Sequence, residues 1–154
     1  YDFKSLEKII RIVTASKISL KYALAKFYII DFALKGAKDP VHEFIKRFKK
    51  NTSFKVIVND IKKIRRLNSK FHPITIKKLG MACSYPGTFN SSIYTIINSR
   101  NYKEAILKTI KAGGCNCSRA NFTGAYFAAL KGLNSIPNSW IKKTIPAKKI
   151  LSQK

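Results

Sequence analysis

Two cysteines and a serine stand close together in residues 113–118, which read Gly-Gly-Cys-Asn-Cys-Ser. Thiolates bind soft metal ions such as Zn²⁺ and Cu⁺, and a thiol near a helix N-terminus is more acidic and therefore available for redox chemistry. Tetrahedral zinc would need two more protein ligands besides Cys115 and Cys117. Buried free cysteines that pack as small apolar groups are the more common alternative. The other histidine and cysteine side chains of the chain are His42, His72 and Cys83.

Two helices are expected to position this loop. Apolar residues recur at the spacing of one helix face on both sides of it; they are Tyr102, Ala105, Ile106, Thr109 and Ile110 before the loop and Phe122, Ala125, Tyr126, Ala129 and Leu130 after it. Gly113 and Gly114 are expected to end the first helix, because glycine adopts the left-handed conformation of helix C-termini. Ser118 is the expected N-cap of the second helix, and Gly132 its end.

A second segment with possible binding chemistry reads Cys-Ser-Tyr-Pro-Gly-Thr-Phe over residues 83–89. Proline followed by glycine predicts a type II turn at Pro86 and Gly87. Tyr85 and Phe89 could stack on an adenine or a ribose, or they could fill the core.

These motifs resemble the C-terminal signature of the ADP-ribosylglycohydrolase superfamily, in which Gly-Gly-Asp-x-Asp-Thr/Ser precedes a helix of small residues. The cysteines in place of both aspartates, and the 83–89 segment, are closest to the branch of the jellyfish J-type crystallins and selenoprotein J. The resemblance covers about residues 71–145, so we expect a fragment, the C-terminal part of a normally larger domain. Further residues that carry it are Ala120, Gly124, Ala125, Gly132, Ile136, Pro137 and Trp140.

The resemblance also implies a site. In active family members the loop aspartates help to hold two Mg²⁺ or Mn²⁺ ions, which orient ADP-ribose and a hydrolytic water. The aligned metal positions here are Cys115, Cys117 and Ser118, and thiols are poor ligands for hard cations. We therefore expect no catalytic residue and no cofactor from these residues, with Mg²⁺ or Mn²⁺ only if the full-length protein keeps the family site. The candidate ligand-binding residues are Tyr85, Gly87, Phe89, Gly113, Gly114, Asn116 and Ser118.

Helical spacing recurs along the rest of the chain, and alternating strand patterns are absent. We predict one all-α domain over residues 1–154, with seven or eight packed helices. The most apolar stretch, residues 18–34, is interrupted by Lys21, Lys26 and Asp31, so it is expected to be a core helix and not a membrane span. Asp39 and Pro40 should begin the next helix, Pro73 a short one, and Pro137 the last one before a basic tail.

The chain is strongly basic, with 31 Lys and Arg against 7 Asp and Glu and a net charge of +24. Such a charge is typical of nucleic-acid-binding modules, but lysine far outnumbers arginine, which favours compositional drift in an AT-rich genome. Either origin predicts non-specific affinity for polyanions. An odd number of cysteines and no visible signal peptide indicate the cytoplasm.

The expected function is that of a divergent, non-catalytic family member, either a crystallin-like structural protein or an ADP-ribose-binding relic. One alternative is a hydrolase of ADP-ribose linkages whose metal ligands come from a missing N-terminal half. Another is a basic nucleic-acid-binding module. An ADP-ribose-type ligand is the expected partner, and the sequence leaves the oligomeric state open.

Overall fold

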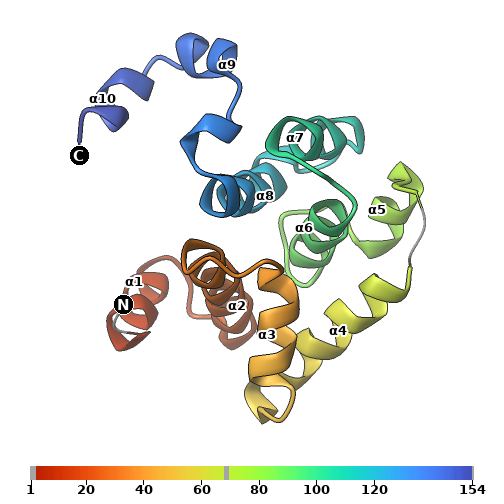
Figure 1. Ribbon diagram of the computed structural model, residues 1–154. Coiled ribbons are helices and arrows are strands. Elements are labelled where there is room, and N and C mark those ends of the chain that lie inside the picture. The colour runs from red at the N-terminus through yellow and green to blue at the C-terminus, as the bar shows by residue number, and fades with distance from the viewer. Residues whose placement is uncertain (1–2, 68–69, 154) are drawn as a thin grey trace.

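The computed structural model describes residues 3–67 and 70–153, and over these residues the chain is all helical, as predicted. Figure 1 shows the order of the helices along the chain. The elements are α1 (Phe3–Val13), α2 (Lys17–Leu34), α3 (Pro40–Phe48), the 3₁₀ helix η1 (Thr52–Phe54), α4 (Lys55–Arg66), α5 (Pro73–Leu79), α6 (Gly87–Ile97), α7 (Tyr102–Lys111), α8 (Asn116–Lys131), the 3₁₀ helix η2 (Leu133–Ser135), α9 (Asn138–Lys143) and α10 (Ala147–Leu151).

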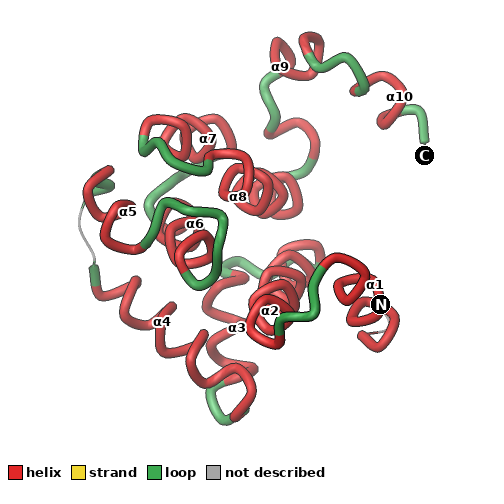
Figure 2. Tube along the Cα trace, turned by 180° about the vertical axis from the view of Figure 1, so that it is seen from behind, coloured by secondary structure: helices red, strands yellow, loops and turns green. Residues whose placement is uncertain are grey.

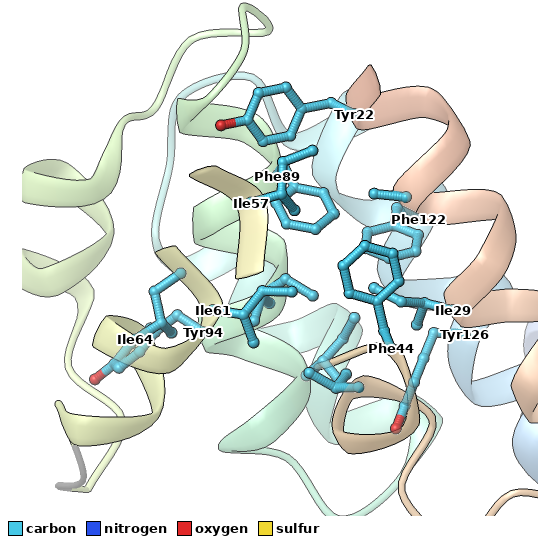
Figure 3. Packing of buried hydrophobic residues seen from close by; sticks show 14 of the residues in the cluster. Tyr22, Ile29, Phe44, Ile57, Ile61, Ile64, Phe89, Tyr94, Phe122 and Tyr126 are labelled. Atoms are coloured by element: carbon cyan, nitrogen blue, oxygen red, sulfur yellow. The ribbon is translucent and has the colours of Figure 1, made fainter. Parts of the chain in front are cut away.

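Helix α6 lies at the centre, packed against α4, α5, α7 and α8. Phe89 and Ile93 of α6 are fully buried, and the core around them is shown in Figure 3. The remaining fully buried large apolar side chains come mainly from α2, α3, α4 and α8, and include Ile29, Phe44, Ile61 and Phe122. The helices at the two ends of the chain, α1 and α10, lie on the same side of the molecule, and α9 and α10 lead away from the bundle (Figures 1 and 2).

Three polar side chains inside α6 find carbonyl acceptors, two of them in the backbone of α6 itself. Ser92 and Thr95 are fully buried, and their hydroxyls donate to carbonyls one turn earlier, at 2.7 and 3.0 Å. The Ser91 hydroxyl donates to the Gly80 carbonyl at 2.6 Å, at the end of α5. These hydrogen bonds help a helix with no charged residue to be buried on nearly all sides, although the buried Thr88 hydroxyl has no partner among the described residues.

Several sequence expectations about the helix ends are confirmed. The Asp39 carboxylate accepts from the His42 N–H at 2.9 Å, and Pro40 opens α3. Pro73 likewise opens α5, and Gly132 ends α8.

Three local expectations are wrong. Helix α8 begins at Asn116 with Cys115 as its N-cap, so Ser118 lies inside the first turn. Pro86 has ψ −11° and Gly87 begins α6 without a positive φ, so this is not a type II turn. Helix α10 follows α9, so the helix after Pro137 is not the last one. The described residues therefore hold ten α-helices, more than the seven or eight expected. None of the described helices has the length and apolar character needed to cross a bilayer.

Candidate ligand and thiol site

The loop between α7 and α8 is held directly against the backbone of Met81. Gly113 and Gly114 have φ of +72° and +73°, a conformation that only glycine adopts without strain. A Cβ on Gly114 would lie 2.7 Å from the Met81 carbonyl oxygen, so no larger residue fits there. The N–H of Cys115 donates to that same carbonyl at 2.8 Å. The 113–118 loop is therefore joined to the chain just before the second segment, residues 83–89, at Met81.

Arg119, from the first turns of α8, fastens this junction from inside. Its side chain is fully buried, and its guanidinium donates to the carbonyls of Met81 at 3.2 Å and Thr109 at 3.3 Å. It also donates to the Gly113 carbonyl and, at 3.0 Å, to the Asn116 side-chain oxygen. Among the described residues, its Nε–H is buried without a hydrogen-bond partner. We call these contacts the Arg119 clasp; its acceptors are backbone carbonyls and an amide, not a carboxylate.

The thiols lie at the N-terminal end of α8. Cys115 Sγ is 3.7 Å from Cys117 Sγ and 3.1 Å from the Ser118 hydroxyl oxygen. Hydrogen bonds from the Ser118 side chain and backbone, with smaller effects of Cys117 and Cys83, lower the pKa of Cys115 to about 7. All three cysteines are free; Cys83 and Cys117 are exposed and Cys115 is partly buried. Cys83, which is distant in sequence, thus lies close to Cys115.

Tyr85, two residues after Cys83, packs against α2. Its ring stacks on Tyr22 with centroids 5.1 Å apart and planes 7° apart. The ammonium of Lys26 lies 5.0 Å from the Tyr85 centroid and 5.3 Å from that of Phe122. Burial lowers the pKa of Lys26 to about 8 and raises the pKa of Tyr85.

A cavity of about 360 Å³ opens beside this aromatic pair, on the side of α2 and α4. Its lining combines aromatic and apolar groups with the polar side chains of Lys21, Thr52 and Ser53. The full lining is Ile18, Lys21, Tyr22, Thr52, Ser53, Val56, Ile57, Tyr85 and Pro86.

The predicted ligand residues have different surroundings in the structure. Tyr85 lines the cavity, whereas the Phe89 ring is fully buried and stacks on Phe122 with centroids 5.9 Å apart. A Cβ on Gly87 would lie 3.1 Å from Gly80 Cα, so Gly87 allows α5 and α6 to approach closely. Gly113 and Gly114 lie in the loop before α8, and Asn116 and Ser118 lie in the first turn of α8.

Sequence reasoning missed Arg119, Met81, Tyr22 and Lys26. The spacing of Asn116 and Arg119, three residues apart on one helix, was the one local signal for part of the clasp. The other contacts of these four residues join segments that are distant in the chain.

The comparisons with known proteins agree with these motifs. A family model described as ADP-ribosylglycohydrolase matches residues 4–152.

The chain belongs to the ADP-ribosylglycohydrolase family.

The match extends well beyond residues 71–145, which carried the resemblance in the sequence. Among ADP-ribosylglycohydrolase relatives, the chain is similar to Crystallin J1A of Tripedalia cystophora, with 38% identity over 69 residues, 45% of this chain and 21% of that crystallin. It is also similar to Crystallin J1B of the same organism, with 30% identity over 76 residues, 49% of this chain and 24% of that protein. These matches support the crystallin J-like branch, and the chain spans only about a quarter or less of the length of either crystallin.

The side chains at the signature loop do not fit the two hard divalent cations that the family resemblance implies. Cys115 and Cys117 offer sulfur where Mg²⁺ and Mn²⁺ prefer oxygen, and the Ser118 hydroxyl is in contact with Cys115 Sγ. Within residues 3–67 and 70–153, no group of three or more His, Cys, Asp or Glu side chains is arranged to hold a metal ion.

Proposed function

We propose that this chain is a divergent ADP-ribosylglycohydrolase family member whose own residues do not perform metal-dependent hydrolysis, and that it binds an ADP-ribose-type ligand without a metal. The observation that carries this proposal is the thiol pair, Cys115 and Cys117, at the positions that align with the family's metal-binding aspartates. A carboxylate can bridge to a hard cation, and a thiol at the same place cannot replace it.

The Arg119 clasp supports the same proposal on electrostatic grounds. A guanidinium stays protonated, and this one is fully buried at the base of the loop. Burial lowers the pKa of Arg119, and a Cys115 thiolate raises it by stabilising the charged guanidinium. The two side chains therefore interact electrostatically. A cation already fixed beside the loop disfavours a second and third positive ion there, because like charges repel strongly where water is excluded.

The surface around Tyr85 offers the contacts that such a ligand requires. The stacked Tyr22 and Tyr85 rings present apolar area for a nucleobase or a ribose. Lys21 on the rim of the cavity is a cation for a phosphate group. The cavity and the signature loop flank the same short segment, residues 81–86, so one extended ligand could contact both.

Calorimetry with ADP-ribose, with and without Mg²⁺, tests the proposal. We expect weak binding that Mg²⁺ leaves unchanged, and no release of ADP-ribose from ADP-ribosylated substrates. Replacing Tyr85 with Ala should weaken binding by about tenfold or more, since a stacking ring contributes about 1–3 kcal/mol. Tyr102→Ala is the matched control, because Tyr102 lines a different cavity, beside α9.

A double variant, Cys115→Asp with Cys117→Asp, restores the oxygen ligands of the family. Calorimetry on this variant tests whether these two carboxylates alone make ADP-ribose binding depend on Mg²⁺. Strong Mg²⁺-dependent binding or hydrolysis by the unmodified chain would overturn the proposal. Absence of ADP-ribose binding under every condition would leave only the crystallin-like structural role.

A further inference from the structure

We propose that Cys115 and Cys117 are a redox-active dithiol, which a low-molecular-weight disulfide such as oxidised glutathione converts to a disulfide within the loop. This inference is independent of ligand binding and of hydrolysis. It concerns a covalent chemistry that the signature loop acquires because both side chains are thiols.

The geometry of the pair carries the proposal. The two sulfur atoms are already 3.7 Å apart, in van der Waals contact, and a disulfide needs about 2.0 Å. Cys115 is the N-cap of α8 and Cys117 lies in its first turn, so closing the bond does not require two helices to shift. Cys117 is exposed and Cys115 is partly exposed, so a small disulfide can reach the pair from solvent.

The surroundings favour Cys115 as the attacking thiol. Its sulfur contacts the Ser118 hydroxyl and lies at the N-cap of α8, where the helix dipole favours negative charge. The buried guanidinium of Arg119 donates its hydrogen bonds to neutral acceptors and not to a carboxylate. A Cys115 thiolate is therefore the anion that balances this buried cation.

The chemistry balances in two steps. The Cys115 thiolate attacks one sulfur of oxidised glutathione, so that a mixed disulfide forms and one glutathione thiolate leaves. Cys117 then loses its proton to solvent and attacks Cys115 Sγ, which forms the loop disulfide and releases the second glutathione. Two protein thiols are oxidised and one small disulfide is reduced to two thiols.

Cys83 is the third thiol near the pair, and replacing it tests whether the disulfide involves only Cys115 and Cys117. It lies on the facing segment, close enough to Cys115 to affect its acidity, but it belongs to a different part of the chain. The proposal commits to the pair within the loop, because their sulfur contact requires no movement between segments.

The experiment uses the full chain, reduced and freed of reductant, then mixed with oxidised glutathione. Of the three free thiols, we expect two to disappear without retained glutathione, and peptide mapping by mass spectrometry should place the bond between Cys115 and Cys117. Cys83→Ser should behave like the parent. Cys117→Ser should accumulate the Cys115–glutathione mixed disulfide, since the second attack is removed.

Cys115→Ser should slow the loss of the first thiol by about tenfold or more, because Cys117 has fewer stabilising contacts. Far-ultraviolet circular dichroism shows whether each variant keeps its helices. The proposal is overturned if all three thiols persist in the folded parent, if glutathione stays attached to the loop, or if the mapped bond joins Cys83. Phenylarsine oxide, which needs two neighbouring thiols, should bind the reduced parent and Cys83→Ser but not Cys117→Ser.

Discussion

Lys26 is a cation placed among aromatic rings. Its ammonium lies over the faces of Tyr85 and Phe122, and burial lowers its pKa from 10.5 to about 8. The rings attract the cation, but the lowered pKa shows that lost hydration outweighs this attraction. The charged form of Lys26 is therefore a net cost to the folded state at neutral pH.

This balance predicts a pH dependence of stability. Between about pH 8 and 10.5 the unfolded chain keeps the Lys26 proton that the folded chain has lost, so the Lys26 contribution to the free energy of unfolding rises with pH. Lys26→Met should remove this rise and should stabilise the protein by about 1–2 kcal/mol at pH 7. Urea unfolding of parent and variant at about pH 7.5 and about pH 9.5 measures both effects.

Lys21→Met is the control for this prediction, because Lys21 lies on the same helix and is exposed. The titration of Tyr22 and Tyr126 affects the parent and the variant alike, so its effect on stability drops out of the comparison. Burial raises the pKa of both tyrosines to about 12, so they lower stability only above their ordinary pKa of 10.0. An identical pH slope in the parent and in Lys26→Met would contradict the assignment.

At the scale of elements, the α7–α8 loop depends on a glycine that no other residue can replace. Gly114→Ala combines a positive φ with a Cβ 2.7 Å from the Met81 carbonyl oxygen, and should destabilise the protein by about 2–4 kcal/mol. Gly36→Ala is the matched variant, since it has a similar φ of +81° with nothing within 4 Å of its Cβ. It should lose only about 1 kcal/mol, measured by thermal or urea unfolding. Equal losses would mean that the contact with Met81 is unimportant.

The Arg119 clasp links α7, α8 and the segment after α5. Removing it takes a hydrogen-bond donor from the carbonyls of Met81, Thr109 and Gly113. Arg119→Met should destabilise the protein by about 3 kcal/mol or more, because each unsatisfied buried group costs about 1–3 kcal/mol. Arg119→Lys should recover part of this loss, since it keeps the charge but not the planar fork. Arg66→Met, at an exposed position in α4, should change stability by less than about 0.5 kcal/mol. Urea unfolding ranks the four proteins; a parent-like Arg119→Met would refute the clasp.

The helices that could be predicted from sequence are those with one apolar face and a clear capping residue. Helix α3 has both, with Asp39 and Pro40 at its start and Phe44 and Phe48 on its buried face. Helix α6 begins at Gly87, where a turn was expected. Gly87 is required by the close approach of Gly80, which is a tertiary contact. The start of α8 was misplaced for a related reason, since Cys115 N–H is held by Met81.

Only those parts of the candidate site that lie in short sequence motifs could be predicted. The cysteine loop and Tyr85 were found because unusual residue types stand in short motifs. Arg119 escaped attention because the Met81 and Thr109 carbonyls that it binds are 38 and 10 residues away along the chain. Any residue type offers a backbone carbonyl, so such a partner leaves no trace in the amino-acid sequence.

At the scale of the whole molecule, charge dominates. The chain has 31 basic and 7 acidic residues, an excess of 24 positive charges. Glu7, Asp31, Asp39 and Glu104 are already paired with cations of the same chain. The surface is therefore expected to attract any polyanion through counterion release.

This charge predicts binding that depends on salt and not on sequence. Unrelated DNA duplexes of equal length should bind with equal affinity at low salt, and the affinity should fall by about a thousandfold or more between about 0.05 and 0.2 M salt. Fluorescence anisotropy across a salt series measures this. Tight binding that survives about 0.2 M salt, or preference for one duplex, would instead support a dedicated nucleic-acid-binding module.

The Arg119 clasp has a consequence for the evolution of the loop. Because Arg119, the glycines and the Cys115 N–H hold the loop, the side chains of residues 115 and 117 are not needed for this, and substitutions at these two positions should cost little folding free energy. Selection for folding alone would leave both positions free to vary among small side chains, while Arg119 and Gly114 would stay fixed. A saturation library scored for soluble expression should show this contrast, and any intolerance at Cys115 and Cys117 should emerge only when the screen selects for their chemistry.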